Sequence, residues 1–376
     1  MPSRDPIAAE GRRPAGRVWA WAWPAAALAA GLVVHHPALR LGFVSDDYEC
    51  LQHARVVLRD PSLLLAPFGG FRPVNTWLLA LNMIAGGVRP FGYHLFNLAL
   101  FLACGALLYL LLARLGASRP VCAAVAALWV CSPYSREPAD TVSSRYEIFL
   151  LACWLGLALV WPAPGSRWTR RRIAGATALV ALSALTKESW VVLPAFCFTF
   201  DVCLSRLAPG RALRRAALVA LAPLAYVAAY LARPAIVPGT YLTGGIPALA
   251  RIPHALAVFL DLRELVPAMP ALGAAEIFAA AAFAALLLLG WRWRIPAAGV
   301  GLAFFLLPFV PILTVPFLTS RYTTIPLLGF LVVGHLDGGF RTLAPHAPSA
   351  AEAVRHWTEA GFHPKVIRPV PRRPAT

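Results

Sequence analysis

The dominant feature of this chain is a series of apolar runs that alternate with short arginine-rich segments. A helix that crosses a bilayer needs about 20 mostly apolar residues. The chain is 59% hydrophobic and 14% charged, whereas soluble domains carry about 25% charged residues. The sequence therefore predicts an all-α polytopic membrane protein with about ten transmembrane helices. The candidate spans are 18–38, 92–113, 120–133, 146–162, 172–185, 189–204, 213–232, 271–290, 296–314 and 322–340.

The arginines between the runs set the expected orientation. The formal net charge is +17, and nearly all of the basic residues are arginines grouped beside apolar runs. Because short cytoplasmic loops are enriched in Arg and Lys, we place these groups and both termini in the cytoplasm. Residues 1–340 then form the transmembrane domain, and residues 341–376 form a partly disordered cytoplasmic tail. No basic group is interleaved with stacking aromatic residues in a soluble domain, so nucleic acid is not an expected partner.

Residues 39–91 form the first outer loop in this topology. The loop contains the run VNTWLLALNMIAGG at 74–87, which as a full span would move Arg114 and Arg119 to the outside. We expect this run to be short and re-entrant, or to lie along the membrane interface as an amphipathic helix. Two further outer segments follow at 134–145 and 233–270.

Two adjacent carboxylates, Asp46 and Asp47, follow the first span at its outer end. Carboxylates at a bilayer edge are costly in so apolar a chain and commonly serve chemistry. Because paired acids share charge, one member is favoured to exchange protons. The alternative interpretation is a solvated loop or a helix N-cap.

Other ionisable residues map to the same outer face. Lys187 and Glu188 interrupt an apolar stretch, and the chain has only one other lysine, Lys365. An ammonium group in that position suits a lipid phosphate. The alternative is that loop-end charges pair with one another at the interface. The remaining outer-face candidates are Arg72, His94, Glu137, Arg145, Arg321 and Tyr322.

The order of these segments resembles the GT-C membrane glycosyltransferases. It is most similar to the branch of protein O-mannosyltransferase-like enzymes that includes eukaryotic transmembrane proteins with TPR repeats. No TPR array is recognisable in this sequence, and the resemblance covers roughly residues 40–330. The segments that carry it are FVSDDYECLQHA, FRPVNTWLLALNMIAGGVRPFGYHLFNLALF, CSPYSREPADTVSSRYEIFL, LTKESWVVLP and SRYTTIPLLGF.

The resemblance implies a polyprenyl-phosphate sugar donor in the outer leaflet and a protein or glycan acceptor that enters from outside. It implies Asp46 as general base, with Asp47 beside it orienting substrate or an optional divalent cation. Which aspartate is the base stays open. Arg72, Lys187 and Arg321 are the expected donor-phosphate ligands. The expected supporting residues are Arg145, Glu188, Glu137, His94 and Tyr322, and no dedicated metal site is expected.

The sequence thus predicts a glycosyltransferase of the bacterial inner membrane with its active site facing the periplasm. The bacterial assignment rests on the abundance of Ala, Pro, Gly and Arg, which is typical of a GC-rich genome. Two other functions stay open. One is a transporter or flippase of a lipid-linked intermediate. For that function we would expect charges buried in mid-span and inverted repeats. The other is a non-catalytic membrane subunit of GT-C type.

Overall fold

The computed structural model describes residues 15–44, 46–65, 72–132, 135–162, 168–203 and 205–231, together with Gly301, Phe304 and Leu307. The regular elements in these ranges are all helices. The predicted spans 271–290 and 322–340, most of 296–314, the outer segment 233–270 and the tail 341–376 lie outside the described residues.

The helices follow the predicted apolar runs closely in the described part of the chain. Predicted span 189–204 is divided into a 3-10 turn and a short helix, and the run 74–87 forms a helix of its own. The elements are α1 (Ala15–His35), η1 (His36–Arg40), α2 (Asp46–Arg59), η2 (Pro61–Leu65), α3 (Pro73–Gly86), α4 (Pro90–Arg114), α5 (Arg119–Cys131), α6 (Arg136–Asp140), α7 (Arg145–Val160), α8 (Arg170–Ala184), η4 (Glu188–Val192), α9 (Leu193–Cys203) and α10 (Pro209–Leu231).

One described helix, α4, is both long enough and apolar enough to cross a membrane. It has 25 residues and a mean hydropathy of 2.4 over its most apolar window. Two shorter apolar helical stretches are Arg119–Cys131 and Ser189–Cys203. Length and composition therefore support a span at α4, and the polytopic arrangement remains a prediction.

Proline and glycine set several helix boundaries. Pro73, Pro90 and Pro120 lie in the first turns of α3, α4 and α5, where a missing backbone N–H costs nothing. Gly87, with φ of +63°, follows α3 and allows the chain to turn directly into α4. Gly116, with φ of +89°, follows α4 in the same way.

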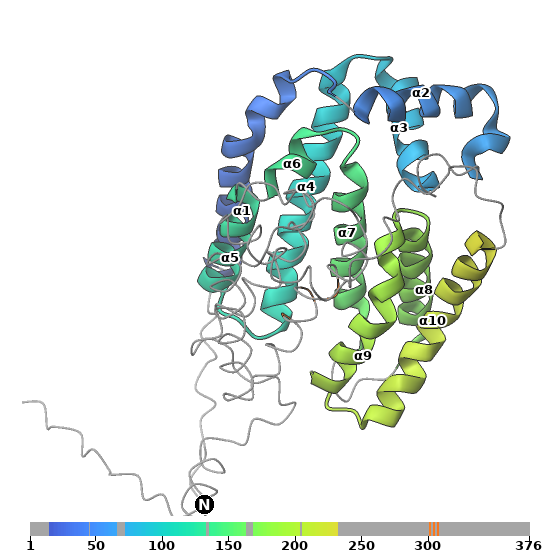
Figure 1. The fold of residues 1–376 in the computed structure, drawn as a ribbon. Helices are drawn as coiled ribbons and strands as arrows, with labels where there is room; N and C mark the ends of the chain where they lie inside the picture. The colour runs from blue at the N-terminus through green and yellow to red at the C-terminus, as the bar shows by residue number, and fades with distance from the viewer. Residues whose placement is uncertain are drawn as a thin grey trace, which may run out of the picture. The chain divides into compact units, whose positions relative to one another are not determined.

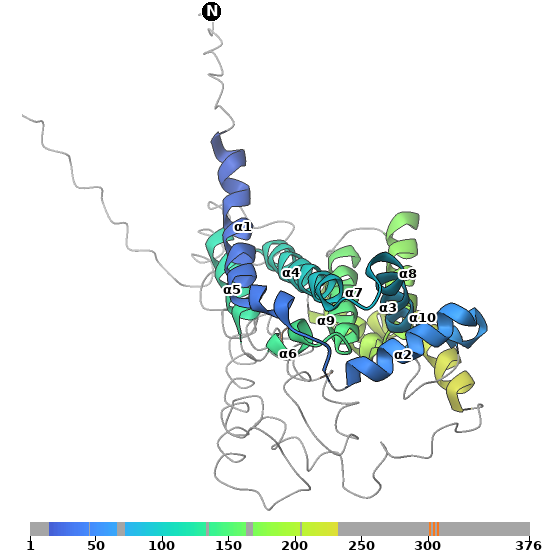
Figure 2. The ribbon, with the colours of Figure 1, turned by 90° about the horizontal axis from the view of Figure 1, so that it is seen from above.

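The long helices pack side by side. α1 packs against α5, α5 against α4, α4 against α7, and α7 against α8, while α10 packs against both α8 and α9. α2 packs on α3 and lies across one end of the long helices (Figures 1 and 2). At this end α1 and α8 finish, whereas α4 and α7 begin. It is called the α2 end below.

The run 74–87 does not run the length of the neighbouring helices. The backbone N–H of Val74 donates to the carbonyl of Leu185, just after α8, at 3.0 Å. Asn82, two turns further along α3, contacts Arg145 at the start of α7. Since both contacts lie at the α2 end, α3 is a short helix confined to that end.

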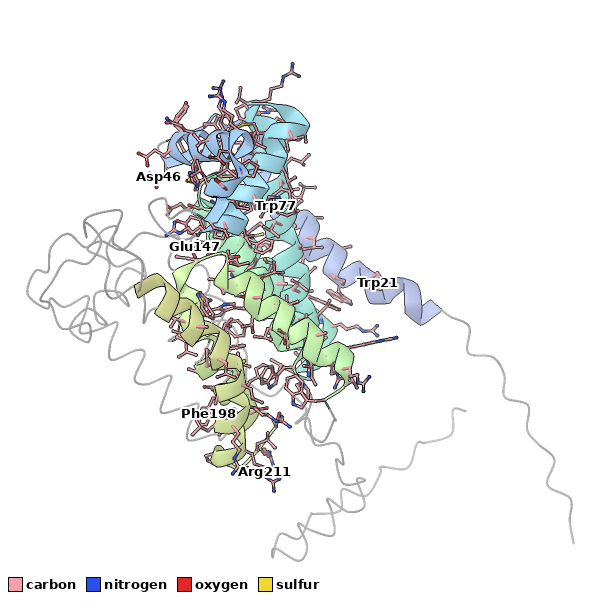
Figure 3. The ribbon with its side chains drawn as sticks, turned by 90° about the vertical axis from the view of Figure 1, so that its right-hand side faces the viewer. Trp21, Asp46, Trp77, Glu147, Phe198 and Arg211 are labelled. Atoms are coloured by element: carbon pink, nitrogen blue, oxygen red, sulfur yellow. The ribbon has the colours of Figure 1, made fainter. Side chains whose placement is uncertain are left out.

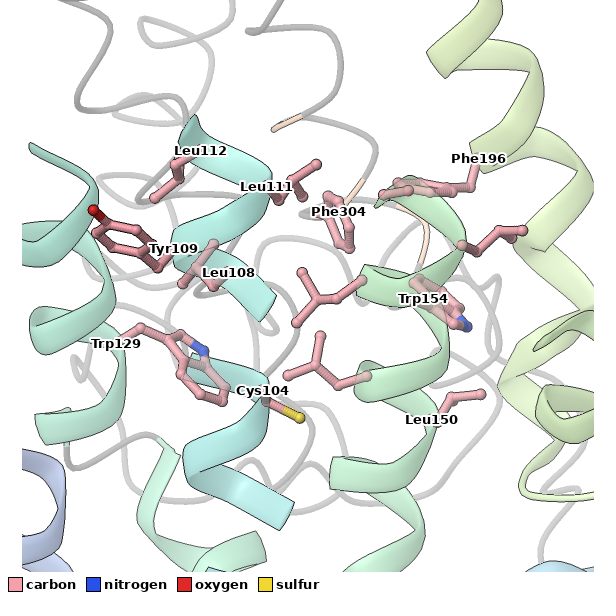
Figure 4. Close-up of a cluster of buried hydrophobic side chains, with 14 of the residues drawn as sticks. Cys104, Leu108, Tyr109, Leu111, Leu112, Trp129, Leu150, Trp154, Phe196 and Phe304 are labelled. Atoms are coloured by element: carbon pink, nitrogen blue, oxygen red, sulfur yellow. The ribbon is translucent and has the colours of Figure 1, made fainter. Parts of the chain in front are cut away.

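An aromatic core joins α4, α5, α7 and α9 (Figure 4). The rings of Trp154 and Phe196 stack with centroids 5.9 Å apart. Phe304 packs edge-on to Phe196 at 4.5 Å and is fully buried. The predicted span 296–314 therefore contributes at least one side chain to the core formed by the first half of the chain.

Candidate functional site

Buried polar side chains gather at the α2 end. Burying such groups in an apolar chain is costly unless they are paired or used. Figure 3 shows Asp46 toward this end and Arg211 toward the other. The buried polar side chains of this end come from α1, α2, α3, α4 and the segments 135–147 and 186–189. They belong to His35, Asp47, Asn75, Thr76, His94, Asn97, Ser135, Ser143, Ser144, Arg145, Glu147, Thr186, Lys187 and Ser189.

The two aspartates have different environments. Asp46 is exposed at the first position of α2, whereas Asp47 is fully buried. The Asp47 carboxylate accepts hydrogen bonds from the backbone N–H groups of Val44 at 3.0 Å and Ser143 at 2.6 Å. Asp47 therefore ties the segment before α2 to the segment before α7, and Asp46 is the exposed aspartate of the pair.

Arg72 and Lys187 meet at one aromatic ring. The Arg72 guanidinium carbon lies 4.2 Å from the ring centroid of Tyr146, and the Lys187 ammonium lies 5.3 Å from it. Both distances are within the range of cation–π attraction. The structure thus brings together two of the three predicted phosphate ligands, which are 115 positions apart in the chain.

Lys187 also forms a buried ion pair. Its ammonium contacts the Glu147 carboxylate, and both side chains are less than a tenth exposed. Glu147 was not among the predicted site residues. A buried lysine needs a nearby anion. In the sequence, the glutamate of the segment SRYE, which is Glu147, was a candidate for this anion.

Arg145 is a fully buried connector between three helices. Its guanidinium donates to Asn97 at 2.6 Å, to Asn82 at 2.5 Å and to the carbonyl of Tyr93 at 3.1 Å. All three acceptors are neutral oxygens, so Arg145 joins α3 and α4 to α7. Arg145 is therefore enclosed by protein groups, and its predicted supporting role stays a prediction.

His94 lies in the same polar region and is fully buried on α4. Among the residues that the structure describes, neither of its ring nitrogens has a hydrogen-bond partner at good geometry, although the imidazole lies close to the backbone of Gly42. Asp47, Asp140 and Arg145 act on it electrostatically. The predicted supporting residue Glu137 is half-buried in α6, and its backbone carbonyl accepts from the N–H of Thr141 at 2.9 Å.

The remaining predicted site residues are described in part or not at all. Glu188 begins η4, and its side chain lies outside the described residues. Arg321 and Tyr322 also lie outside them. Among the residues that the structure describes, no group of three His, Cys, Asp or Glu side chains is arranged to hold a metal ion.

Cys50 lies one turn after the aspartates on α2, and nearby charged side chains influence the pKa of its thiol. Burial raises the pKa of its thiol to about 11. The Arg72 guanidinium opposes that increase, whereas the carboxylates of Asp47, Asp46 and Glu49 add to it. One thiol therefore lies within electrostatic range of both aspartates and of Arg72.

A second polar group lies where α7 ends. Arg114 donates to the carbonyl of Ala158 at 2.8 Å and also contacts the carbonyls of Leu159 and Trp161, which closes the C-terminus of α7. Buried Asp201 accepts from the Trp161 indole at 2.9 Å and pairs with Arg215 at 3.3 Å. These contacts join the ends of neighbouring helices, so a structural role explains why these polar side chains lie there.

Comparison with known proteins gives one informative similarity. The chain is similar to the protein O-mannosyl-transferase Tmtc1 of Drosophila melanogaster, with 28% identity over 141 residues. The aligned stretch is 34% of this chain and 16% of the fly protein, so the chain corresponds to a small part of that relative's length. No family model matches the chain, and no solved structure matches it. The similarity indicates a loose relationship to a glycosyltransferase.

Proposed function

We propose that this chain is an integral membrane glycosyltransferase. It transfers a sugar from a polyprenyl-phosphate donor to a protein or glycan hydroxyl on the extracytoplasmic side of a bacterial inner membrane. The observation that carries the proposal is the gathering, at the α2 end, of an exposed carboxylate, Asp46, and two cations on one buried ring, Arg72 and Lys187. The distant similarity to a mannosyl-transferase supports the reaction class.

The flanks of the helices support a lipid environment. Trp21 on α1, Val33 on α1 and Leu218 on α10 are 73%, 70% and 71% exposed. Exposed apolar side chains along helix flanks are costly in water and favourable against lipid tails. Together with the apolar helix α4, they support the proposed polytopic arrangement.

The chemistry assigns separate tasks to the acid and the cations. The Asp46 carboxylate takes the proton of the acceptor hydroxyl as the acceptor oxygen bonds to the anomeric carbon. The bond between that carbon and the phosphate oxygen breaks, and the lipid phosphate leaves with an added negative charge. Arg72 and Lys187 stabilise that charge. Asp47 holds the segment before α2 against the segment before α7. We choose Asp46 as the base because its carboxylate is exposed.

The test is sugar transfer by the full chain in proteoliposomes with radiolabelled polyprenyl-phosphate sugars. Asp46→Asn should lower kcat by about 10²- to 10⁴-fold, the usual contribution of a general base. Glu49→Gln, which removes another exposed carboxylate from the first turn of α2, is the matched control and should retain activity. Unchanged transfer by Asp46→Asn would overturn the mechanism, and absence of transfer by the wild type with every donor would favour a non-catalytic subunit.

A further inference from the structure

We propose that Tyr146 is a positioning residue that sets the spacing of Arg72 and Lys187 for the donor phosphate. This inference rests on the proposed function. Tyr146 is buried at the first turn of α7, with 6% of its surface exposed. The amino-acid sequence does not distinguish Tyr146 from a packing residue, because an aromatic residue at the start of an apolar run is commonly part of the core.

The geometry around the ring carries the inference. Arg72 Cζ and Lys187 Nζ lie 4.2 Å and 5.3 Å from the same centroid, so they are no farther apart than the sum of these distances. Two like charges at such separations repel each other. The negative face of an aromatic ring attracts both and does so more strongly where water is excluded. Tyr146 therefore offsets the repulsion that would drive the cations apart.

The backbone around the ring makes its position well defined. Arg72 precedes α3, and Val74 donates to the carbonyl of Leu185 at 3.0 Å, which fixes the Arg72 and Lys187 segments to each other. Glu147, the residue after Tyr146, pairs with Lys187. The first turn of α7 thus supplies a ring for both cations and a carboxylate for one of them.

The charges at the ring suit an anionic phosphate. Arg72 and Lys187 bring two positive charges to the ring of Tyr146, and Glu147 brings a negative charge beside Lys187. A phosphodiester between a lipid and a sugar is negatively charged and is attracted to the two cations. The Arg72 guanidinium can donate two parallel hydrogen bonds to such a phosphate, whereas Lys187 contributes a point charge.

The test varies the electron density of the ring while its shape stays nearly constant. Phenylalanine and a series of increasingly fluorinated phenylalanines are introduced at position 146 of the full chain. The measured quantities are the Kd for a short-chain isoprenyl phosphate, by calorimetry in nanodiscs, and the KM and kcat for a radiolabelled polyprenyl-phosphate sugar. The expected result is near wild-type binding for Tyr146→Phe and a stepwise increase in Kd and KM with fluorination, reaching about tenfold, with kcat changed much less.

Tyr146→Leu should weaken binding at least as much as the most fluorinated ring. Tyr109→Leu is the matched control, because Tyr109 is a buried tyrosine of α4 in the aromatic core (Figure 4). Equal Kd values across the fluorinated series overturn the role of Tyr146 even if Tyr146→Leu fails to fold. If the wild type binds no isoprenyl phosphate and transfers no sugar, the proposed function fails instead.

Discussion

The Asp47 carboxylate accepts a hydrogen bond from the backbone N–H of Ser143 at 2.6 Å, across 96 positions of the chain. This contact joins the loop before α2 to the segment before α7. It gives the second aspartate of the pair a structural task. It also leaves Asp46, on the exposed side of the same helix turn, as the exposed aspartate of the pair and the base in the proposed function.

Asp47→Asn should destabilise the fold more than Asp46→Asn. The substitution replaces a charged acceptor of two backbone N–H groups by an amide with one acceptor oxygen. Hydrogen bonds to charged groups contribute about 1.5–3 kcal/mol each, so a loss of about that size is expected. Thermal unfolding in detergent measures it. If the two variants had equal melting temperatures, the structural role of Asp47 would be wrong.

Breaking the Lys187–Glu147 pair should be costly from either side. Glu147→Leu and Lys187→Met each leave one buried charge without its partner, at an expected cost of about 3–5 kcal/mol. The double variant should recover much of that stability, because no uncompensated charge remains. It should not recover donor binding, since Lys187 is absent. A double-mutant cycle on unfolding free energies is the measurement, and purely additive effects would contradict the pairing.

Gly105→Ala should destabilise the contact of α4 with α5. A Cβ at Gly105 would lie 2.6 Å from a methyl carbon of Val130, and overpacking of this kind costs about 1–3 kcal/mol. Gly92→Ala, also on α4, is the control, because a Cβ there meets no heavy atom within 4 Å. That variant should match or slightly exceed the wild type in stability. Val130→Ala combined with Gly105→Ala should relieve the clash.

Cys50 should react slowly with thiol reagents near pH 8, and faster as the pH approaches 11. Burial holds the pKa of the thiol at about 11, so little thiolate is present at neutral pH. Because the Asp46 carboxylate raises this pKa, Asp46→Asn should speed alkylation. Because Arg72 lowers it, Arg72→Gln should slow alkylation.

The same pKa has a consequence for stability. In the unfolded chain the thiol titrates near its ordinary value, so the stabilisation from its raised pKa is fully present below about pH 9. It is lost as the pH rises from about 9 to about 11. Cys50→Ser should flatten this part of the profile of unfolding free energy against pH. An unchanged slope would show that other groups dominate.

The helices of the described part and the residues available for chemistry follow from the amino-acid sequence alone. Apolar runs predicted α1, α4, α5, α7, α8 and α10 to within a few residues, because helix length and hydrophobicity are local properties. The proline and glycine positions determined where α3 and α4 begin and end, since φ is a property of the single residue.

Which of these residues meet depends on how the helices pack. Asp46 and Asp47 are adjacent in sequence, but neighbouring side chains of a helix point about 100° apart, so packing buries one and exposes the other. The pairing of Lys187 with Glu147 and the meeting of Arg72 and Lys187 at Tyr146 depend on how α3, α7 and α8 pack. A buried charge demands a partner, but the sequence does not say which one, because partners distant in the chain are chosen by the fold.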